Sequence, residues 1–217
     1  PIVMVAAGGD PVSAGLINSL GRPGTNVTGS VIMSPELNGK RLELVKELVP
    51  GATRVAVVWN PTLSGTEAQL PPLQAAARSL GVELSMHAVR HVDDLPGIED
   101  AIGREASQAL LILPDPAVLE SHLGRTLSMA ERLKLPTVYP WRSYVNAGGL
   151  AAYAPSLPDH FRRAAVSLDR IIRGESASEL PVEQPTSFEF SLNASAARKL
   201  GLSVPPSVLA RVDELVE

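Results

Sequence analysis

The strongest constraint on the fold is a regular alternation of short β-branched runs with longer stretches whose apolar residues recur at helical spacing. The run 54–59 ends at Asn60-Pro61, and the next stretch has its leucines on one helical face and ends at Gly81. Further strand-like runs lie at 82–88, 109–113, 137–139 and 150–154. Strands joined by crossovers of helical length are mostly parallel, because right-handed crossovers are the common connection. The pattern predicts a doubly wound, flavodoxin-like α/β domain.

Segments outside this stretch predict a second α/β lobe. They comprise strands at 2–6 and 27–33, a helix at 12–20, and a long helix at 157–173 with Phe161, Ala164, Leu168 and Ile171 on one stripe. A Pro-punctuated tail contains a strand at 187–192, a helix at 194–200 and a last helical turn after Pro205-Pro206. The predicted division is a first, partial lobe from 1–33 and 155–185, a second lobe from 34–154, and a tail from 186–217 whose lobe is left open.

Composition excludes several classes of protein. The 217 residues are 45% apolar, enough for a real core, and the net charge of −4 without a long basic run argues against a nucleic-acid partner. The absence of cysteine removes disulfides, thiol nucleophiles and Cys-based zinc sites. The four histidines lie apart and match no catalytic or metal motif, so we expect no catalytic residue, metal or cofactor. His87 and His91 are expected at a solvated strand end, and His160 exposed in a first helical turn.

Candidate binding residues follow the predicted strands, because ligands of parallel sheets sit outside the carboxyl ends of the strands. Asp10, Asn60 and Asp115 each come just after a strand, and most of the few aromatic residues gather after or near strands. An aromatic or flat apolar moiety in the ligand would use these rings. Asp115, between two prolines, is either a helix N-cap or the fixed anion that meets a ligand ammonium.

Two other segments also leave alternatives open. Gly8-Gly9-Asp10 is either an anion cradle or a tight turn, and no nucleotide-binding motif accompanies it. In the loop 22–29, Asn26 and Thr28 hydrogen-bond either a ligand or the loop itself. Asp10 and Asp115 are the one pair of acids that can be placed at neighbouring strand ends, and we interpret them as binding rather than catalytic residues.

Short motifs occur in a fixed order along the whole chain. They are Gly9-Asp10-Pro11-Val12, Arg22-Pro23-Gly24-Thr25-Asn26-Val27-Thr28-Gly29, Gly39-Lys40-Arg41-Leu42-Glu43-Leu44, Trp59-Asn60-Pro61, Pro114-Asp115-Pro116, Tyr139-Pro140-Trp141-Arg142, Ala147-Gly148-Gly149-Leu150, Leu180-Pro181-Val182-Glu183-Gln184-Pro185-Thr186 and Ala197-Arg198-Lys199-Leu200-Gly201-Leu202. Together they resemble the substrate-binding protein family of ABC importers that includes tryptophan-binding members.

This resemblance implies a two-lobed periplasmic-binding-protein fold without enzymatic activity. Such a protein captures a small organic ligand, an amino acid or an aromatic or apolar acid, by lobe closure and passes it to an ABC permease in the inner membrane. The location implied is periplasmic or lipid-anchored. An acidic residue at the place of Asp115 is implied as the partner of the ligand ammonium. The implied cleft positions are Asp10, Thr28, Asn60, Ser64, Asp115, Tyr139, Trp141 and Tyr144.

The resemblance also implies a signal peptide and an additional stretch before the strand at 2–6. With that stretch missing, we expect either self-association by strand-edge pairing around 2–6 or an incomplete first lobe. Two alternative functions stay open. One is a cytosolic two-domain α/β enzyme, which would need a matched acid/base pair, and the other is the ligand-sensing domain of a regulator.

Overall fold

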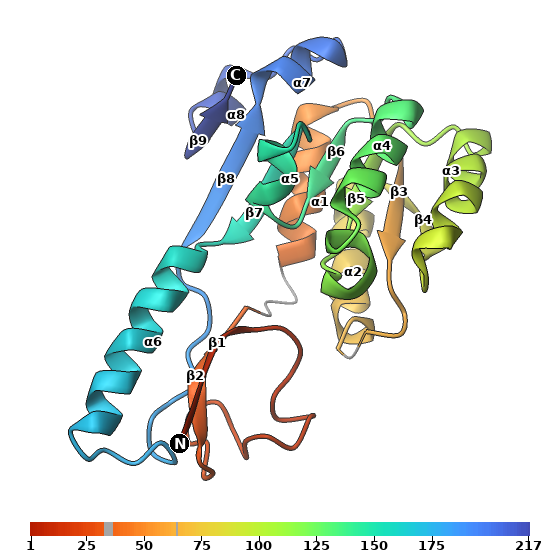
Figure 1. Ribbon diagram of the computed structural model, residues 1–217. Helices are drawn as coiled ribbons and strands as arrows, with labels where there is room; N and C mark the ends of the chain where they lie inside the picture. Colours follow the sequence, from red (N-terminus) through yellow and green to blue (C-terminus); the bar gives the residue numbers. More distant parts are fainter. Residues whose placement is uncertain (33–36, 64) are drawn as a thin grey trace. The chain divides into compact units, whose positions relative to one another are not determined.

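The computed structural model describes residues 1–32, 37–63 and 65–217 and divides the chain into two compact units. Unit 1 comprises Pro1–Ser34 and Pro155–Phe188, and unit 2 comprises Pro35–Ala154 and Glu189–Glu217. The structural elements are labelled in Figure 1. Within the described residues, no helix is both long enough and apolar enough to span a bilayer.

The described part of unit 2 is built on a sheet with the strand order β4-β3-β5-β6-β7-β8-β9 (Figure 1). The pairs β3/β4, β3/β5, β5/β6 and β6/β7 are all parallel. In chain order these five strands run 2-1-3-4-5, which is the flavodoxin-like arrangement and confirms the predicted fold class. The strands are β3 Arg54–Trp59, β4 Glu83–Ala88, β5 Ala109–Ile112, β6 Thr137–Tyr139, β7 Ala151–Pro155, β8 Phe188–Asn193 and β9 Glu214–Val216.

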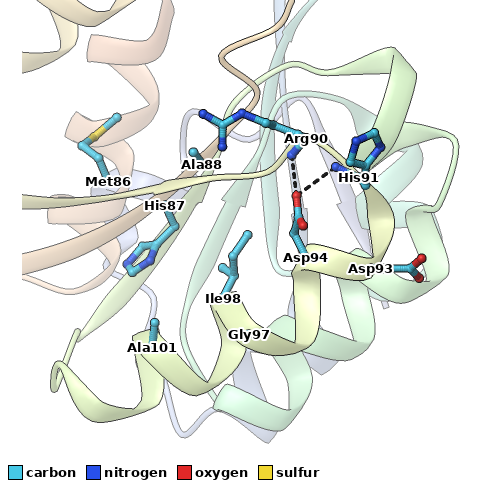
Figure 2. A pocket seen from close by; sticks show the side chains of 10 residues that line it. All are labelled: Met86, His87, Ala88, Arg90, His91, Asp93, Asp94, Gly97, Ile98 and Ala101. Atoms are coloured by element: carbon cyan, nitrogen blue, oxygen red, sulfur yellow. Dashed lines mark hydrogen bonds between the residues drawn. The ribbon is translucent and has the colours of Figure 1, made fainter.

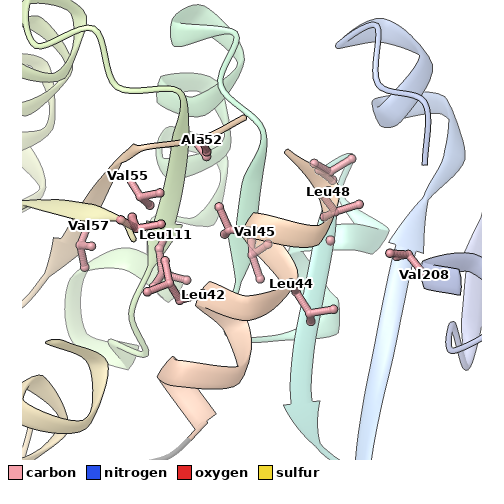
Figure 3. Packing of buried hydrophobic residues seen from close by; sticks show 14 of the residues in the cluster. Leu42, Leu44, Val45, Leu48, Ala52, Val55, Val57, Leu111 and Val208 are labelled. Carbon is pink, nitrogen blue, oxygen red and sulfur yellow. The ribbon is translucent and has the colours of Figure 1, made fainter. Parts of the chain in front are cut away.

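Helices cover both faces of this sheet, and alternate strand residues point to opposite faces. Val55 and Val57 of β3 enter one apolar cluster with α1 and α2, shown in Figure 3, whereas Ala56 and Val58 enter the cluster under α3 and α4. The sheet is therefore buried on both sides, as its continuous apolar strands require. The helices are α1 Leu37–Leu48, α2 Leu70–Leu80, α3 Leu95–Arg104, α4 Leu123–Leu133, α5 Arg142–Asn146, α7 Ala194–Lys199 and α8 Pro206–Leu209.

The helix ends show where local sequence decides structure. Gly81 ends α2 in the left-handed region at φ 65°, as its position after the leucine face predicts. The segment between β5 and β6 is divided into a short π-helical turn, η3 (Pro116–Glu120), and α4. His122 separates them with a non-helical backbone, φ −119° and ψ 40°. Two shorter 3-10 turns, η1 (Glu67–Gln69) and η2 (Val92–Asp94), precede α2 and α3.

In unit 1, two parallel strands, β1 Ile2–Ala7 and β2 Val27–Val31, pack against one long helix, α6 Leu157–Ile172. Gly29 of β2 has φ +122°, and a Cβ there would lie 2.0 Å from the Met4 carbonyl oxygen. Only glycine fits that position, which explains why a glycine follows Thr28 within β2.

Three expectations for unit 1 are wrong. Residues 12–20 form hydrogen-bonded turns instead of a helix, because Gly15 lies in the left-handed region at φ 70° and most side chains there are exposed. The expected stripe of α6 is rotated, since Phe161 is 64% and Leu168 49% exposed. Ala164 of the expected stripe is buried, but the packed face is completed by Ser167 and His160, so His160 is buried rather than exposed.

The carboxyl-terminal tail joins unit 2 through β8 and β9. Ser191, Leu192 and Asn193 pair in parallel register with 214–216. The strand β9 was not predicted, because three residues carry too little periodicity to distinguish a strand from a turn. His87, expected at a solvated strand end, is buried at 9% exposure on β4, since its ring is covered by the last turn of α3.

Candidate functional site

The strand order of unit 2 reverses between β3 and β5, and ligands of such sheets bind outside the carboxyl ends of the strands at this point. Asn60 follows β3 and Asp115 follows β5. Asn60 Nδ2 donates a hydrogen bond to Asp115 Oδ2 at 3.2 Å, and the two residues are 2% and 0% exposed. The structure thus brings together two of the residues predicted from strand ends.

Asp115 caps η3. Its Oδ1 accepts hydrogen bonds from the backbone N–H groups of Ala117 and Val118 at 3.0 and 3.2 Å, and its Oδ2 accepts from Leu119 at 3.3 Å. With the Asn60 amide, these bonds occupy the roughly four acceptor positions of a carboxylate. The N-cap, one of the two alternatives for Asp115, is therefore its role in this structure, and contact with a ligand ammonium stays a prediction.

Asn60 is itself fixed by the loop that follows β3. Its Oδ1 accepts from the backbone N–H and the hydroxyl of Thr62 at 2.9 and 2.7 Å. This Asx-type turn directs the Asn60 amide toward Asp115. The other residue predicted in this loop, Ser64, lies outside the described residues.

Tyr139 and Tyr144 lie in the core beneath this edge. Their rings stack with centroids 4.7 Å apart and planes 11° apart, and they are 2% and 0% exposed. Burial raises the pKa of both phenols above the ordinary value. Within the part of the chain that the structure describes, the Tyr144 hydroxyl has no hydrogen-bond partner. These two predicted residues therefore support the edge from below, and one of them keeps an unsatisfied polar group there.

Trp141 links two strand ends. It is the N-cap residue of α5, just after β6, and its indole Nε1–H donates a hydrogen bond to Glu120 Oε1 at the end of η3, after β5. Burial raises the pKa of Glu120 above its ordinary value, and the negative charge of Asp115 acts in the same direction. The indole hydrogen bond and the positive charge of Arg41 act in the opposite direction.

Arg41, in the first turns of α1, supplies a buried positive charge at the same edge. It is 2% exposed and donates to Tyr153 O at 2.8 Å, Asn38 Oδ1 at 2.6 Å and Pro140 O at 3.3 Å. Burial lowers the pKa of Arg41 to about 10, which leaves it charged at neutral pH. The guanidinium thus joins α1 to the ends of β6 and β7 and lies close enough to Glu120 to affect its charge.

Our sequence reasoning did not select Arg41 or Glu120 as site residues. Arg41 does carry a signal, because it falls at the helical phase of buried Leu37, Val45 and Leu48, where a charged residue is unusual. Glu120 has no comparable signal in the sequence. Its importance depends on the contact with Trp141, a residue that no local pattern connects to it.

The remaining predicted residues, Asp10 and Thr28, lie in unit 1. Asp10 accepts from Val12 N at 3.0 Å and from the Ser13 hydroxyl at 2.5 Å, and these bonds lower the pKa of its carboxyl. Thr28 is fully buried and its hydroxyl donates to Leu180 O at 2.7 Å. Both groups are occupied by the loops of unit 1, and their ligand-binding role stays a prediction.

A pocket of about 620 Å³ lies beside the edge strand β4 and α3. Figure 2 shows Asp94 accepting hydrogen bonds from the backbone N–H groups of Arg90 and His91, at 2.8 and 2.9 Å, which closes the turn before α3. The ring of His87, also drawn there, contacts Ser85 and Glu105 through its Nε2. No group of three or more metal-ligating side chains occurs within the described ranges. This pocket lies away from the switch point between β3 and β5.

Known proteins are similar to this chain over most of its length. The family model described as "ABC transporter substrate binding protein" matches residues 1–216. A tyrosine-binding protein of Clostridioides difficile strain R20291 is 26% identical over 204 residues, which cover 93% of this chain and 57% of that protein. This chain therefore spans little more than half the length of that curated relative.

Solved structures share the fold. A conserved domain protein of Vibrio cholerae O1 biovar El Tor is 28% identical with a TM-score of 0.87, covering 99% of this chain and 71% of that one. An ABC domain in complex with L-Trp from Streptococcus pneumoniae is 23% identical with a TM-score of 0.88, covering 100% of this chain and 72% of that one. The periplasmic-binding-protein type of α/β fold is thereby confirmed.

Proposed function

The chain belongs to the ABC transporter substrate-binding protein family, and from this premise we propose that it captures a small amino acid with an aromatic side chain for import. The match over residues 1–216 is the single observation that carries the proposal. The names of two similar proteins, one tyrosine-binding and one solved with L-Trp, support an aromatic ligand. The partly buried Trp59 and Trp141, at the ends of strands of unit 2, fit the same class.

In the proposed mechanism, the ligand favours a closed arrangement of two lobes because it contacts both of them in that state alone. The closed, loaded protein then delivers the ligand to an ABC permease, outside the cytoplasmic membrane, as a periplasmic or lipid-anchored component. In unit 2, the ligand would bind at the carboxyl ends of β3 and β5, where Asn60 and Asp115 meet. No chemical step on the ligand is part of the proposal.

Thermal shift on the natural full-length protein tests this function. The panel contains the twenty L-amino acids, a set of sugars and inorganic anions, and native mass spectrometry identifies any ligand that co-purifies. We expect L-tyrosine, L-tryptophan or L-phenylalanine to raise the melting temperature more than the aliphatic amino acids do, since a ligand that binds the folded state alone stabilises it. The proposal is wrong if only sugars or inorganic anions raise it.

A further inference from the structure

The carboxyl-terminal edge of unit 2 contains two carboxylates, and their hydrogen-bonding states differ. Asp115 is fully buried, and its acceptor positions are occupied by three backbone N–H groups and the Asn60 amide. Glu120 is only partly buried; its Oε1 accepts a hydrogen bond from the Trp141 indole, and the backbone of Asp115 also opposes the rise that burial causes in the pKa of its carboxyl. An incoming cation would have to break the N-cap to bind Asp115, whereas Glu120 can accept it without such a loss.

The charges at this edge do not balance. When both carboxyl groups are ionised, Glu120 and Asp115 contribute two negative charges and Arg41 contributes one positive charge. Asp115 and Arg41 both act on the ionisation of Glu120, in opposite directions. A net negative charge in a largely buried cluster is unfavourable because water no longer screens it. One ammonium group beside Glu120 would make this cluster neutral.

Tyr144 is independent evidence for an occupant at this edge. Its side chain is 0% exposed, and its hydroxyl is unpartnered among the residues described. Burial raises the pKa of this phenol, and the carboxylates of Glu120 and Asp115 lie close enough to raise it further. A buried hydroxyl without a partner is unfavourable, and native structures usually satisfy such a group with a bound molecule or water.

We propose that Glu120, held by the indole of Trp141, binds the primary ammonium group of the ligand and selects amino acids over the corresponding desamino acids. This inference rests on the proposed function and assigns the amino-group position within the same site. It differs from the assignment that the family resemblance implies, in which Asp115 meets the ammonium. Asp115 instead builds the turn that presents Glu120, since Glu120 N donates to Asp115 O at 2.9 Å.

Isothermal titration calorimetry on the natural full-length protein tests the assignment. The probes are L-tryptophan and L-tyrosine, each paired with its desamino analogue, indole-3-propanoate or 3-(4-hydroxyphenyl)propanoate. The variant Glu120→Gln keeps the size of the side chain and an acceptor for Trp141. Glu131→Gln, an exposed position of α4, is the control for an equal change in net charge.

We expect Glu120→Gln to weaken binding of the amino acids by about 30-fold or more, which corresponds to the lower limit for losing one partner of a buried charge pair. Affinity for the desamino analogues should change less than about threefold, and Glu131→Gln should leave both classes unchanged. Trp141→Phe, which removes the indole N–H and keeps an aromatic ring, should weaken the amino acids selectively as well. It serves as the second variant if Glu120→Gln does not fold.

Several results overturn the assignment. If the wild-type protein binds the amino acids and Glu120→Gln binds them equally well, Glu120 does not contact the ammonium. An equal loss for amino acids and desamino analogues indicates a structural role only. If the wild-type protein binds neither aromatic amino acid, the proposed function is wrong, and the assignment of Glu120 is wrong as well. The titration of the wild-type protein alone identifies this case.

Discussion

Replacing Asp115 with alanine tests whether its carboxylate acts as the cap of η3. The change removes three backbone hydrogen bonds and leaves the Asn60 amide, 2% exposed, without its acceptor. Loss of an N-cap costs about 1 kcal/mol, and a buried donor left unsatisfied costs about 1–3 kcal/mol. We therefore expect Asp115→Ala to lower the free energy of unfolding of unit 2 by about 2–4 kcal/mol.

Urea denaturation followed by tryptophan fluorescence measures this loss in the relevant unit, because both tryptophans of the chain, Trp59 and Trp141, lie in unit 2. With an m-value of about 2 kcal/mol/M, the midpoint should fall by about 1–2 M. Asp115→Asn is the matched control. Its side-chain oxygen can still accept from Ala117 and Val118, whereas its amide meets the Leu119 and Asn60 donors, so it should retain about half of the lost stability. A midpoint shift for Asp115→Ala below about 0.3 M would refute the capping argument.

Two further predictions concern packing and pH. A Cβ on Gly149 would lie 2.7 Å from the ring of Tyr139, so Gly149→Ala should destabilise unit 2 by about 1–3 kcal/mol in the same urea assay. Gly97→Ala, the control in an open helical position of α3, should stabilise unit 2 by about 0.5–1 kcal/mol. Equal effects of the two substitutions would contradict the close approach at Gly149. Burial lowers the pKa of His160 below 6.5, so this side chain binds a proton more readily in the unfolded chain than in the folded one. The stability that neutral His160 contributes is therefore complete above about pH 6.5 and is lost as the pH falls through the lowered pKa. Thermal unfolding between pH 5 and 7.5 should show this loss in the wild-type protein and a flatter profile in His160→Asn, and parallel profiles would exclude His160 as the cause.

Local patterns predicted those elements whose determinants are local. The β-branched run 54–59 is a strand with the expected bounds, and Gly81 ends α2 where the leucine face ends. The helix expected at 12–20 does not form because Gly15 lies in the left-handed region and most side chains of this segment are exposed. The stripe on α6 was displaced because unit 1 packs Ala164 and His160 against the strands instead of Phe161, a choice that depends on the facing surface and not on the helix itself.

The candidate site also contains residues that local sequence predicts and residues whose roles depend on distant contacts. Asn60 and Asp115 were each predicted as strand-end residues, and they meet because parallel strands end at one edge of a sheet. The expectation that Asp10 and Asp115 lie at neighbouring strand ends is wrong, since Asp10 follows β1 in the two-stranded sheet of unit 1 and Asp115 follows β5 in the sheet of unit 2. The sequence left two roles open for Asp115, because a cap and an ammonium partner need the same residue type at the same place. The role of Arg41 depends on carbonyl groups from two distant strand ends, Pro140 and Tyr153, which no periodicity reveals.

Asp115 and Glu120 have different roles in the proposed site, so substitutions of the two residues are expected to have different effects. Asp115 caps η3 and accepts the Glu120 N–H through its carbonyl, so Asp115→Ala is expected to disturb the position of Glu120 and weaken amino acid binding indirectly. Asp115→Asn keeps the cap and removes the charge, whereas Glu120→Gln keeps the side-chain shape and removes the charge from the other carboxylate. If Glu120 binds the ammonium, Asp115→Asn retains most of the affinity and Glu120→Gln loses it. If Asp115 binds the ammonium directly, the order is reversed, with a loss of roughly 30-fold or more in Asp115→Asn although this variant is more stable than Asp115→Ala.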